Sequence, residues 1–158
     1  MTTPVTITGL EDAKALVGTH LGHTEYVAID QARVDDFADA TGDHQWIHVD
    51  PVRAADGPFG GTIAHGYLTL SMTPFFLPKL VRFSGFGLAV NYGCERVRFP
   101  APVPVGAALR CGATYDAVKE VPGGIQSEIT LTFEVEGQEK PGCVAAIVLR
   151  HYQRGQGA

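Results

Sequence analysis

The chain has 158 residues, of which 45% are hydrophobic, and it carries a formal net charge of -5. This length and apolar content suffice for one sizeable core, so we expect a single domain over residues 1–158. The balance is acidic, and no run of Lys or Arg is long enough to neutralise a phosphate track, which argues against nucleic acid as a partner.

Three cysteines, Cys94, Cys111 and Cys143, are odd in number, widely separated and free of C-x-x-C spacing. They favour neither a disulfide framework nor a zinc site, and they suit the reduced core of a cytoplasmic protein.

Residues 1–6 lack the basic start and apolar stretch of a signal peptide. The longest apolar stretch, residues 63–80, is interrupted by a histidine, two prolines and a lysine, so we expect a buried helix and no membrane span.

The first elements in chain order are short. Residues 10–17 are predicted to form a helix with two acidic residues in its first turn, where negative charge is favoured, and Gly18 ends it. Residues 25–29 are predicted to be extended. Residues 1–22 therefore form an N-terminal extension to the main body of the domain.

A second helix is predicted from Asp30, a suitable N-cap, through residue 40, and Gly42 ends it. Its inward face includes Val34, Phe37 and Ala38. Pro51 suits the first turn of a small helix over residues 52–55, which Asp50 caps. The stretch between these helices is expected to be a loop.

Residues 64–83 are predicted to form a long helix, apolar on nearly all sides, which must therefore be wrapped by other elements. Pro74 and Pro78 interrupt the pattern, so we expect a bend near residue 74 and a ragged end. Four strands are predicted near 87–100, 107–119, 124–136 and 142–152, with turns at residues 122–124 and 137–138. The result is an α+β protein whose antiparallel sheet curls around one helix, followed by a frayed tail at residues 154–158.

Residues 41–50, Thr-Gly-Asp-His-Gln-Trp-Ile-His-Val-Asp, place a carboxylate and an imidazole five residues apart. Side chains meet on a helix at spacings of three or four, so a turn opened by Gly42 must bring Asp43 and His48 together. Such a pair can hold one water molecule and move its protons near pH 7. The alternative is structural: Asp43 caps a turn and His48 is a satisfied core histidine.

A second block, residues 58–71, and a third, Asn91-Tyr92-Gly93 followed by Val97-Arg98-Phe99-Pro100, complete a pattern. Together the blocks resemble the MaoC-like dehydratases, the (R)-specific enoyl-CoA hydratases. In that family a pattern close to S/T-G-D-x-N-P-x-H-x-D is followed by F-G-x-x-I-x-H-G and a long helix. The resemblance covers about residues 23–150 and implies the hot-dog fold. The matching positions are Asp43, His48 and Asp50 in the first pattern and Phe59, Gly60, Ile63, His65 and Gly66 in the second.

The chain departs from the family at Gln45 and Trp46, which stand where many members carry Asn-Pro. Gln45 keeps an amide, whereas Trp46 gives up the fixed backbone angle of proline and adds a large ring. The indole either narrows the acyl tunnel or packs in the dimer core, and packing is favoured because buried aromatics are mostly core.

The resemblance assigns stabilisation of the enolate oxygen to the backbone N–H of Gly66, at the start of the long helix. His65 is expected to act as a cap or support, and Ser71 and Asn91 are candidate substrate-binding positions near the pocket. Three further histidines, His20, His23 and His151, lack a constellation, and His44 is expected to be exposed.

The resemblance thus implies hydration of 2-enoyl thioesters by a homodimer, with a small acyl thioester as partner and no cofactor or metal. One alternative is a hot-dog thioesterase, whose carboxylate usually lies on the central helix; residues 63–83 contain none. Another is a non-catalytic acyl-binding subunit. The acyl length, CoA against acyl carrier protein, and the division of acid and base roles stay open.

Overall fold

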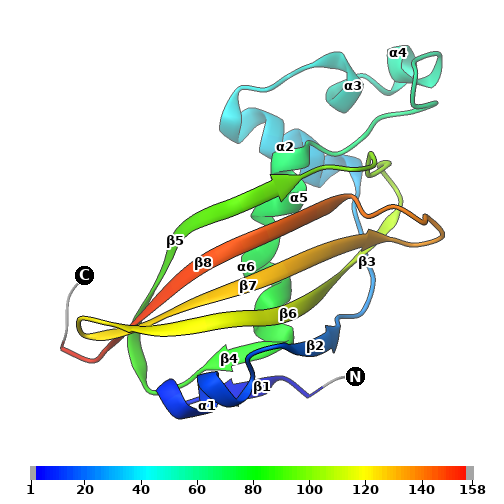
Figure 1. Ribbon diagram of the computed structural model, residues 1–158. Helices are drawn as coiled ribbons and strands as arrows, with labels where there is room; N and C mark the ends of the chain where they lie inside the picture. Colours follow the sequence, from blue (N-terminus) through cyan, green and yellow to red (C-terminus); the bar gives the residue numbers. More distant parts are fainter. Residues whose placement is uncertain (1–2, 156–158) are drawn as a thin grey trace.

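A computed structural model describes residues 3–155 as a sheet packed around a broken helix (Figure 1). The main sheet is antiparallel, with the order β2-β6-β7-β8-β5, and β3 pairs with β6. Its strands are β2 (Thr19–His23), β3 (Val27–Ala28), β5 (Phe86–Arg98), β6 (Ala108–Val121), β7 (Gly124–Val135) and β8 (Cys143–Gln153). The four long strands confirm the predicted ones.

Alternation in β7 explains how the sheet covers the helix. Every second side chain of its later half is buried, and the residues between are half-buried. The turns before and after β7 contain Gly123 and Gly137, both with φ of 76°, a conformation that L side chains adopt with strain. The predicted turns are therefore confirmed. The buried inner row is Ile129, Leu131, Phe133 and Val135.

The predicted helix over residues 64–83 is three shorter pieces and a strand. These are α5 (Gly66–Ser71), α6 (Thr73–Phe76), a 3-10 turn (Leu77–Lys79) and β4 (Val81–Phe83). The break falls at Met72, ahead of the bend predicted near 74. Pro74 has no N–H for the carbonyl of Leu70, which instead accepts the Thr73 hydroxyl at 2.7 Å. The last residues are extended because β4 pairs in parallel with β1 (Val5–Ile7).

The helical pieces are not wrapped on every side by the described chain, which corrects the expectation from their composition. Leu68, Phe76 and Leu77 are buried in the core, but Tyr67 is 70% exposed and Phe75 is 41% exposed. These exposed side chains are available to contact other chains or ligands.

The N-terminal extension joins the sheets. Helix α1 (Leu10–Ala15) confirms the first predicted helix, and Gly18 has φ of 82° where that segment turns toward β2. Because β1 pairs with β4 and β2 pairs with β6, residues 5–23 close one end of the molecule. Of the predicted tail, residues 156–158 lie outside the described residues.

Three helices lie beyond the other end of the sheet, next to the start of α5 (Figure 1): α2 (Gln31–Thr41), α3 (Trp46–Val49) and α4 (Pro51–Ala55). As predicted, Asp30 caps α2 by accepting the Arg33 N–H at 2.9 Å, and Gly42 ends it with φ of 77°. Asp50 caps α4 by accepting the Arg53 N–H at 3.0 Å. Within residues 3–155 no helix has the length and apolarity needed to cross a membrane.

The cysteines are unpaired, as expected. Cys111 and Cys143 are buried, and burial raises the pKa of each thiol to about 12. Cys94 is exposed on β5, so the expectation that all three are core residues is wrong for this one. Its strand lies at the edge of the sheet, where one side of β5 has no neighbouring strand within the described chain.

Candidate active site

The structure brings Asp43 and His48 together, as the spacing predicts. Gly42 turns the chain at the end of α2, Asp43 follows in the loop, and His48 lies in α3. The position of His48 in a one-turn helix corrects the expectation that the whole stretch is a loop. One ligand atom from each of Asp43, His48 and His65 can be chosen so that all lie within 4.8 Å of one another. Two hydrogen bonds of about 2.8 Å to a shared water span such a separation.

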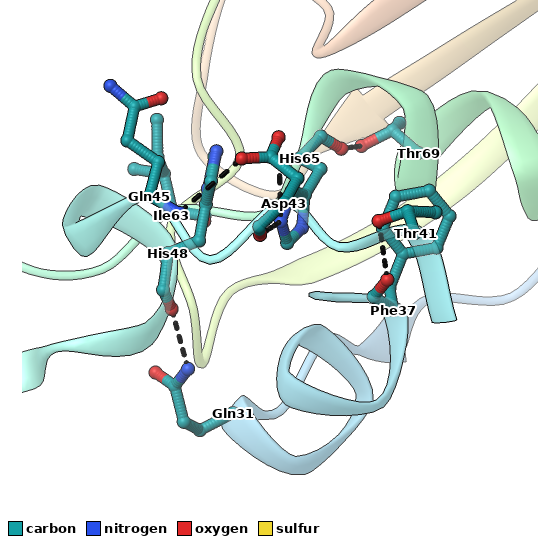
Figure 2. Close-up of polar contacts among 9 residues, drawn as sticks. All are labelled: Gln31, Phe37, Thr41, Asp43, Gln45, His48, Ile63, His65 and Thr69. Carbon is teal, nitrogen blue, oxygen red and sulfur yellow. Dashed lines mark hydrogen bonds and ion pairs between the residues drawn. The ribbon is translucent and has the colours of Figure 1, made fainter. Parts of the chain in front are cut away.

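One hydrogen bond defines the tautomer of His48 (Figure 2). Its Nδ1 lies 2.7 Å from the carbonyl oxygen of Ile63. A carbonyl only accepts, so Nδ1 carries the proton and Nε2 keeps a lone pair. The Ile63 N–H in turn donates to the carbonyl of Ile47 at 3.0 Å, which locks the two segments together. The lone pair on Nε2 of His48 is therefore left free to accept a proton or a hydrogen bond.

The charge state of His48 follows from its surroundings. The side chain is buried, and desolvation lowers its pKa below 6.5, assisted by the neighbouring His65. The hydrogen bond to Ile63 and the charge of Asp43 act in the opposite direction but do not outweigh burial. His48 is therefore neutral at pH 7 and able to accept a proton.

His65 connects the two predicted catalytic residues. Its ring stacks on that of His48, with centroids 3.8 Å apart and an interplanar angle of 26°. Its Nε2–H donates to the backbone carbonyl of Asp43 at 2.9 Å, and the same atom lies 3.9 Å from the carboxylate (Figure 2). Its side chain makes no cap bond to α5, so support of Asp43, not capping, is its observed role. Its Nδ1 is buried without a hydrogen-bond partner among residues 3–155.

Asp43 is the open member of the group. Its side chain is 55% exposed, and Oδ1 accepts only a long 3.4 Å hydrogen bond from the Gln45 N–H. Most of the carboxylate's acceptor capacity is thus free for a ligand or water.

Gln31 is a structural residue of the site that the sequence did not reveal. Its side-chain amide donates to the His48 carbonyl at 2.7 Å, and its amide oxygen accepts the Thr62 hydroxyl at 2.6 Å. One side chain from the start of α2 therefore ties α3 to the strand-like segment that contains Ile63. A glutamine at the first position of a helix carries no local signal for such a role.

A cavity of about 300 Å³, which we call the site cavity, lies beside His48. His48, Gly66, Thr69 and Phe99 contribute to its walls. Gly66 is the first residue of α5, and within residues 3–155 its N–H has no hydrogen-bond partner. Gly66 and the neutral imidazole of His48 therefore line the same cavity, and Asp43 lies in one cluster with His48.

Contact with Phe99, as well as the close approach of a ligand, explains why residue 66 is a glycine. A Cβ there would lie 3.0 to 3.1 Å from three atoms of the Phe99 ring. Phe99 is 41% exposed and meets Tyr67 edge-on, with centroids 5.9 Å apart. Phe99 belongs to the third sequence block but had no predicted role; the structure makes it the cover over Gly66.

Ser71 and Asn91 do not join this group. Both line a separate cavity of about 300 Å³, the middle cavity, together with Leu70, Gly93 and Cys94. Ser71 is on α5 and Asn91 is on β5, and neither lines the cavity that His48 lines, so their role in substrate binding stays a prediction. The reason is the helix geometry: Ser71 lies more than a turn beyond Gly66.

Neither Gln45 nor Trp46, the departure from the family pattern, lines the site cavity or the middle cavity. Gln45 is exposed, and its side chain points away from His48 (Figure 2). The Trp46 ring packs against the backbone at Gly57, with Arg53 above it at 4.4 Å from the ring centroid. Packing within the chain is therefore the observed role of Trp46. Nearby, His44 is exposed as expected, and the hydrogen bond that it donates to the Asp39 carboxylate raises its pKa.

Asp43, His48 and His65 are also the one group among the described residues whose ligand atoms lie close enough to hold a metal ion. The ring nitrogens that already donate to Ile63 and Asp43 carbonyls are not available as ligands in these tautomers. Acid–base chemistry needs no ion at this position.

Comparison with known proteins identifies the family. A model of the MaoC like domain matches residues 12–136. The chain is 48% identical over 147 residues to 3-hydroxyacyl-thioester dehydratase Z of Mycobacterium tuberculosis, covering 92% of this chain and 97% of that one. It is 40% identical over 144 residues to nodulation protein N of Rhizobium meliloti, covering 86% of each.

Among solved structures, the R-hydratase PhaJ1 of Pseudomonas aeruginosa matches with a TM-score of 0.70 at 20% identity, over 87% of this chain and 83% of that one. At that identity the likeness shows the fold. The sheet around α5 and α6 is therefore the hot-dog fold, as the sequence resemblance implied. The chain belongs to the MaoC-like dehydratase family of hydratases and dehydratases.

Proposed function

We propose that the protein is an (R)-specific hydratase/dehydratase that interconverts trans-2-enoyl thioesters and (R)-3-hydroxyacyl thioesters. One observation carries the proposal: a buried, neutral His48, whose Nε2 keeps its lone pair, lies in one cluster with the open carboxylate of Asp43 and lines a cavity to which Gly66 also contributes. The names of the M. tuberculosis relative, a 3-hydroxyacyl-thioester dehydratase, and of the P. aeruginosa structure, an R-hydratase, support the substrate class and the stereochemistry.

In the hydration direction, a water held between Asp43 and His48 attacks C3 of the enoyl group. His48 Nε2 takes one proton from that water, while the Asp43 carboxylate accepts a hydrogen bond from the other. The new C3–O bond pushes the π electrons through C2 to the thioester oxygen, where the Gly66 N–H stabilises the enolate. The imidazolium of His48 then delivers its proton to C2, which restores the neutral histidine.

The stereochemistry follows from the position of the groups. Asp43 and His48 lie together, so water and proton reach the bound enoyl group from one side if the Gly66 N–H holds its carbonyl. This arrangement fits addition to one face. The thioesterase alternative is weaker, because the helical pieces from Gly66 to Lys79 carry no carboxylate.

The proposal includes a homodimer. Within the described chain, β5 pairs only with β8, and its free edge runs for 13 residues with Leu88 and Tyr92 exposed by 44% and 56%. An edge of this length invites pairing with a second copy. Sedimentation at assay concentration should give a dimer, whereas a stable, active monomer of 16.8 kDa would contradict it.

The unpaired thiols support a reducing compartment such as the cytoplasm, and the chemistry requires no cofactor.

The decisive experiment is product analysis after incubation with crotonyl-CoA. We expect 3-hydroxybutyryl-CoA that an (R)-specific dehydrogenase oxidises and an (S)-specific one does not. Release of free CoA would indicate a thioesterase, no reaction would indicate a binding subunit, and oxidation by the (S)-specific enzyme would overturn the stereochemical assignment.

A further inference from the structure

The loop that carries Asp43 is joined to the rest of the site by one hydrogen bond from His65. The His65 Nε2–H donates to the Asp43 backbone carbonyl at 2.9 Å. Within residues 3–155 this is the only hydrogen bond between Asp43 and a segment other than its own loop, because the carboxylate accepts just the long bond from the Gln45 N–H. The position of the Asp43 carboxylate therefore depends on His65 as well as on the turn at Gly42.

The ring of His65 is itself fixed by contacts with two other rings. Its side chain is 3% exposed, and it stacks on His48 with centroids 3.8 Å apart. The ring of Phe37, from α2, lies 5.0 Å from it at an interplanar angle of 52°. Rings packed in this way have little freedom to change rotamer, because the neighbouring atoms occupy the space. The Nε2–H donor is therefore a rigid point of attachment for the Asp43 loop.

The other nitrogen of His65 shows that packing alone does not explain an imidazole at this position. Nδ1 is buried and has no hydrogen-bond partner in the described part of the chain. Leaving a buried polar atom unpaired costs about 1 to 3 kcal/mol, and an apolar ring of similar shape would avoid that cost. What the imidazole provides and an apolar ring cannot is the Nε2–H bond to Asp43.

The proposed reaction requires a short and constant distance between Asp43 and His48. One oxygen of Asp43 and one ring nitrogen of His48 lie within 4.8 Å of each other. Two hydrogen bonds of about 2.8 Å let one water bridge at most about 5.6 Å. Because the Asp43 carboxylate is 55% exposed, solvent would otherwise compete for it and the loop could move out of this range.

We propose that His65 is a positioning residue, whose Nε2–H keeps the Asp43 carboxylate within reach of the water that His48 deprotonates. This inference rests on the proposed function, because that water is a reactant only in the proposed reaction. In this scheme His65 touches neither the substrate nor the water, and it acts through Asp43. Loss of its donor should therefore lower kcat more than it changes KM.

Two amide variants with the same chemistry test this role by hydration of crotonyl-CoA. His65→Gln places a side-chain N–H near the position of Nε2, whereas His65→Asn is one carbon shorter and places it near the position of Nδ1. His65→Asn should lower kcat by roughly 10- to 100-fold, the order of loss for a catalytic group displaced by about 1 Å. His65→Gln should keep most of the wild-type kcat. His44→Gln is the matched control, because it removes an exposed imidazole beside Asp43 that bonds to Asp39 instead, and it should leave kcat unchanged.

NMR spectroscopy separates this inference from the proposed reaction, because it needs no activity. In the wild type the ¹⁵N shifts of His65 should show a proton on Nε2; a proton on Nδ1 alone would overturn the inference even if neither variant folds. Backbone order parameters from Asp43 to Gln45 should fall in His65→Asn and stay at the wild-type values in His65→Gln. This result without hydratase activity would remove the proposed function and keep the role of His65 in holding the loop. Equal kcat in the two variants, or an equally ordered loop in both, would overturn that role even in an active hydratase.

Discussion

Substitution of His151, a buried histidine on β8, should change how the protein responds to acid. Burial lowers the pKa of this imidazole from 6.5 to about 4 in the folded protein, whereas the unfolded chain keeps the ordinary value. Between these two pH values the unfolded state binds more protons than the folded state. The free energy of unfolding therefore falls as the pH falls from 6.5 toward 4, and this contribution is fully present above pH 6.5.

The size of the effect follows from the two pKa values. One pKa unit corresponds to about 1.4 kcal/mol, so His151 accounts for a loss of up to roughly 3 kcal/mol across this window. Marginal stability of about 5 to 15 kcal/mol makes such a loss easy to detect. Phenylalanine cannot be protonated and retains the stack on Phe83, so His151→Phe should be at least as stable as the wild type at pH 7 and clearly more stable at pH 4.

Denaturant unfolding at a series of pH values, with the protein concentration fixed, measures this difference. His48, whose pKa is also lowered, contributes a slope of the same sign in both proteins, so only the difference between them reports on His151. His44→Gln is the control, since His44 is exposed and its pKa is raised by Asp39. Parallel stability curves for wild type and His151→Phe from pH 6.5 to 4 would refute the buried, neutral state of this ring.

The remaining predictions concern the site. Asp43→Asn and His48→Gln should each lower kcat by at least about two orders of magnitude with the fold intact, and the double variant should be little worse than the worse single one; most activity in either folded variant would reject the pair. Because burial lowers the pKa of His48, the acid limb of kcat/KM should lie below pH 6.5, and a midpoint above that value would contradict a neutral base. Dialysis against EDTA should leave activity unchanged; loss that zinc restores would indicate a metal at Asp43, His48 and His65. Gln31→Ala should lower kcat more than KM changes, because it frees the His48 backbone without touching substrate; unchanged kcat would reject its positioning role.

Local chemistry made much of the fold predictable. Asp30, Gly42 and Asp50 mark helix ends because a capping oxygen or a left-handed glycine acts within a few residues, and the structure has these ends where the sequence places them. The four long strands and their glycine turns follow from alternation and turn propensity, which are equally local. Asp43 and His48 were found from a motif, and their proximity required only the turn at Gly42.

Other features depend on contacts between distant residues. The predicted helix ends in β4 because that segment pairs with β1, more than 70 residues earlier. Ile63 sets the tautomer of His48, and Gln31 fixes its backbone, from elements that only the fold brings near. Chain order alone could not separate Ser71 from the site cavity or place Phe99 over Gly66. The sequence by itself determined the elements and the chemical identity of the candidate pair. The tertiary structure decided burial, because burial depends on what the rest of the chain places around a side chain. Burial in turn decided the charge of His48 and left a nitrogen of His151 unpaired among the described residues.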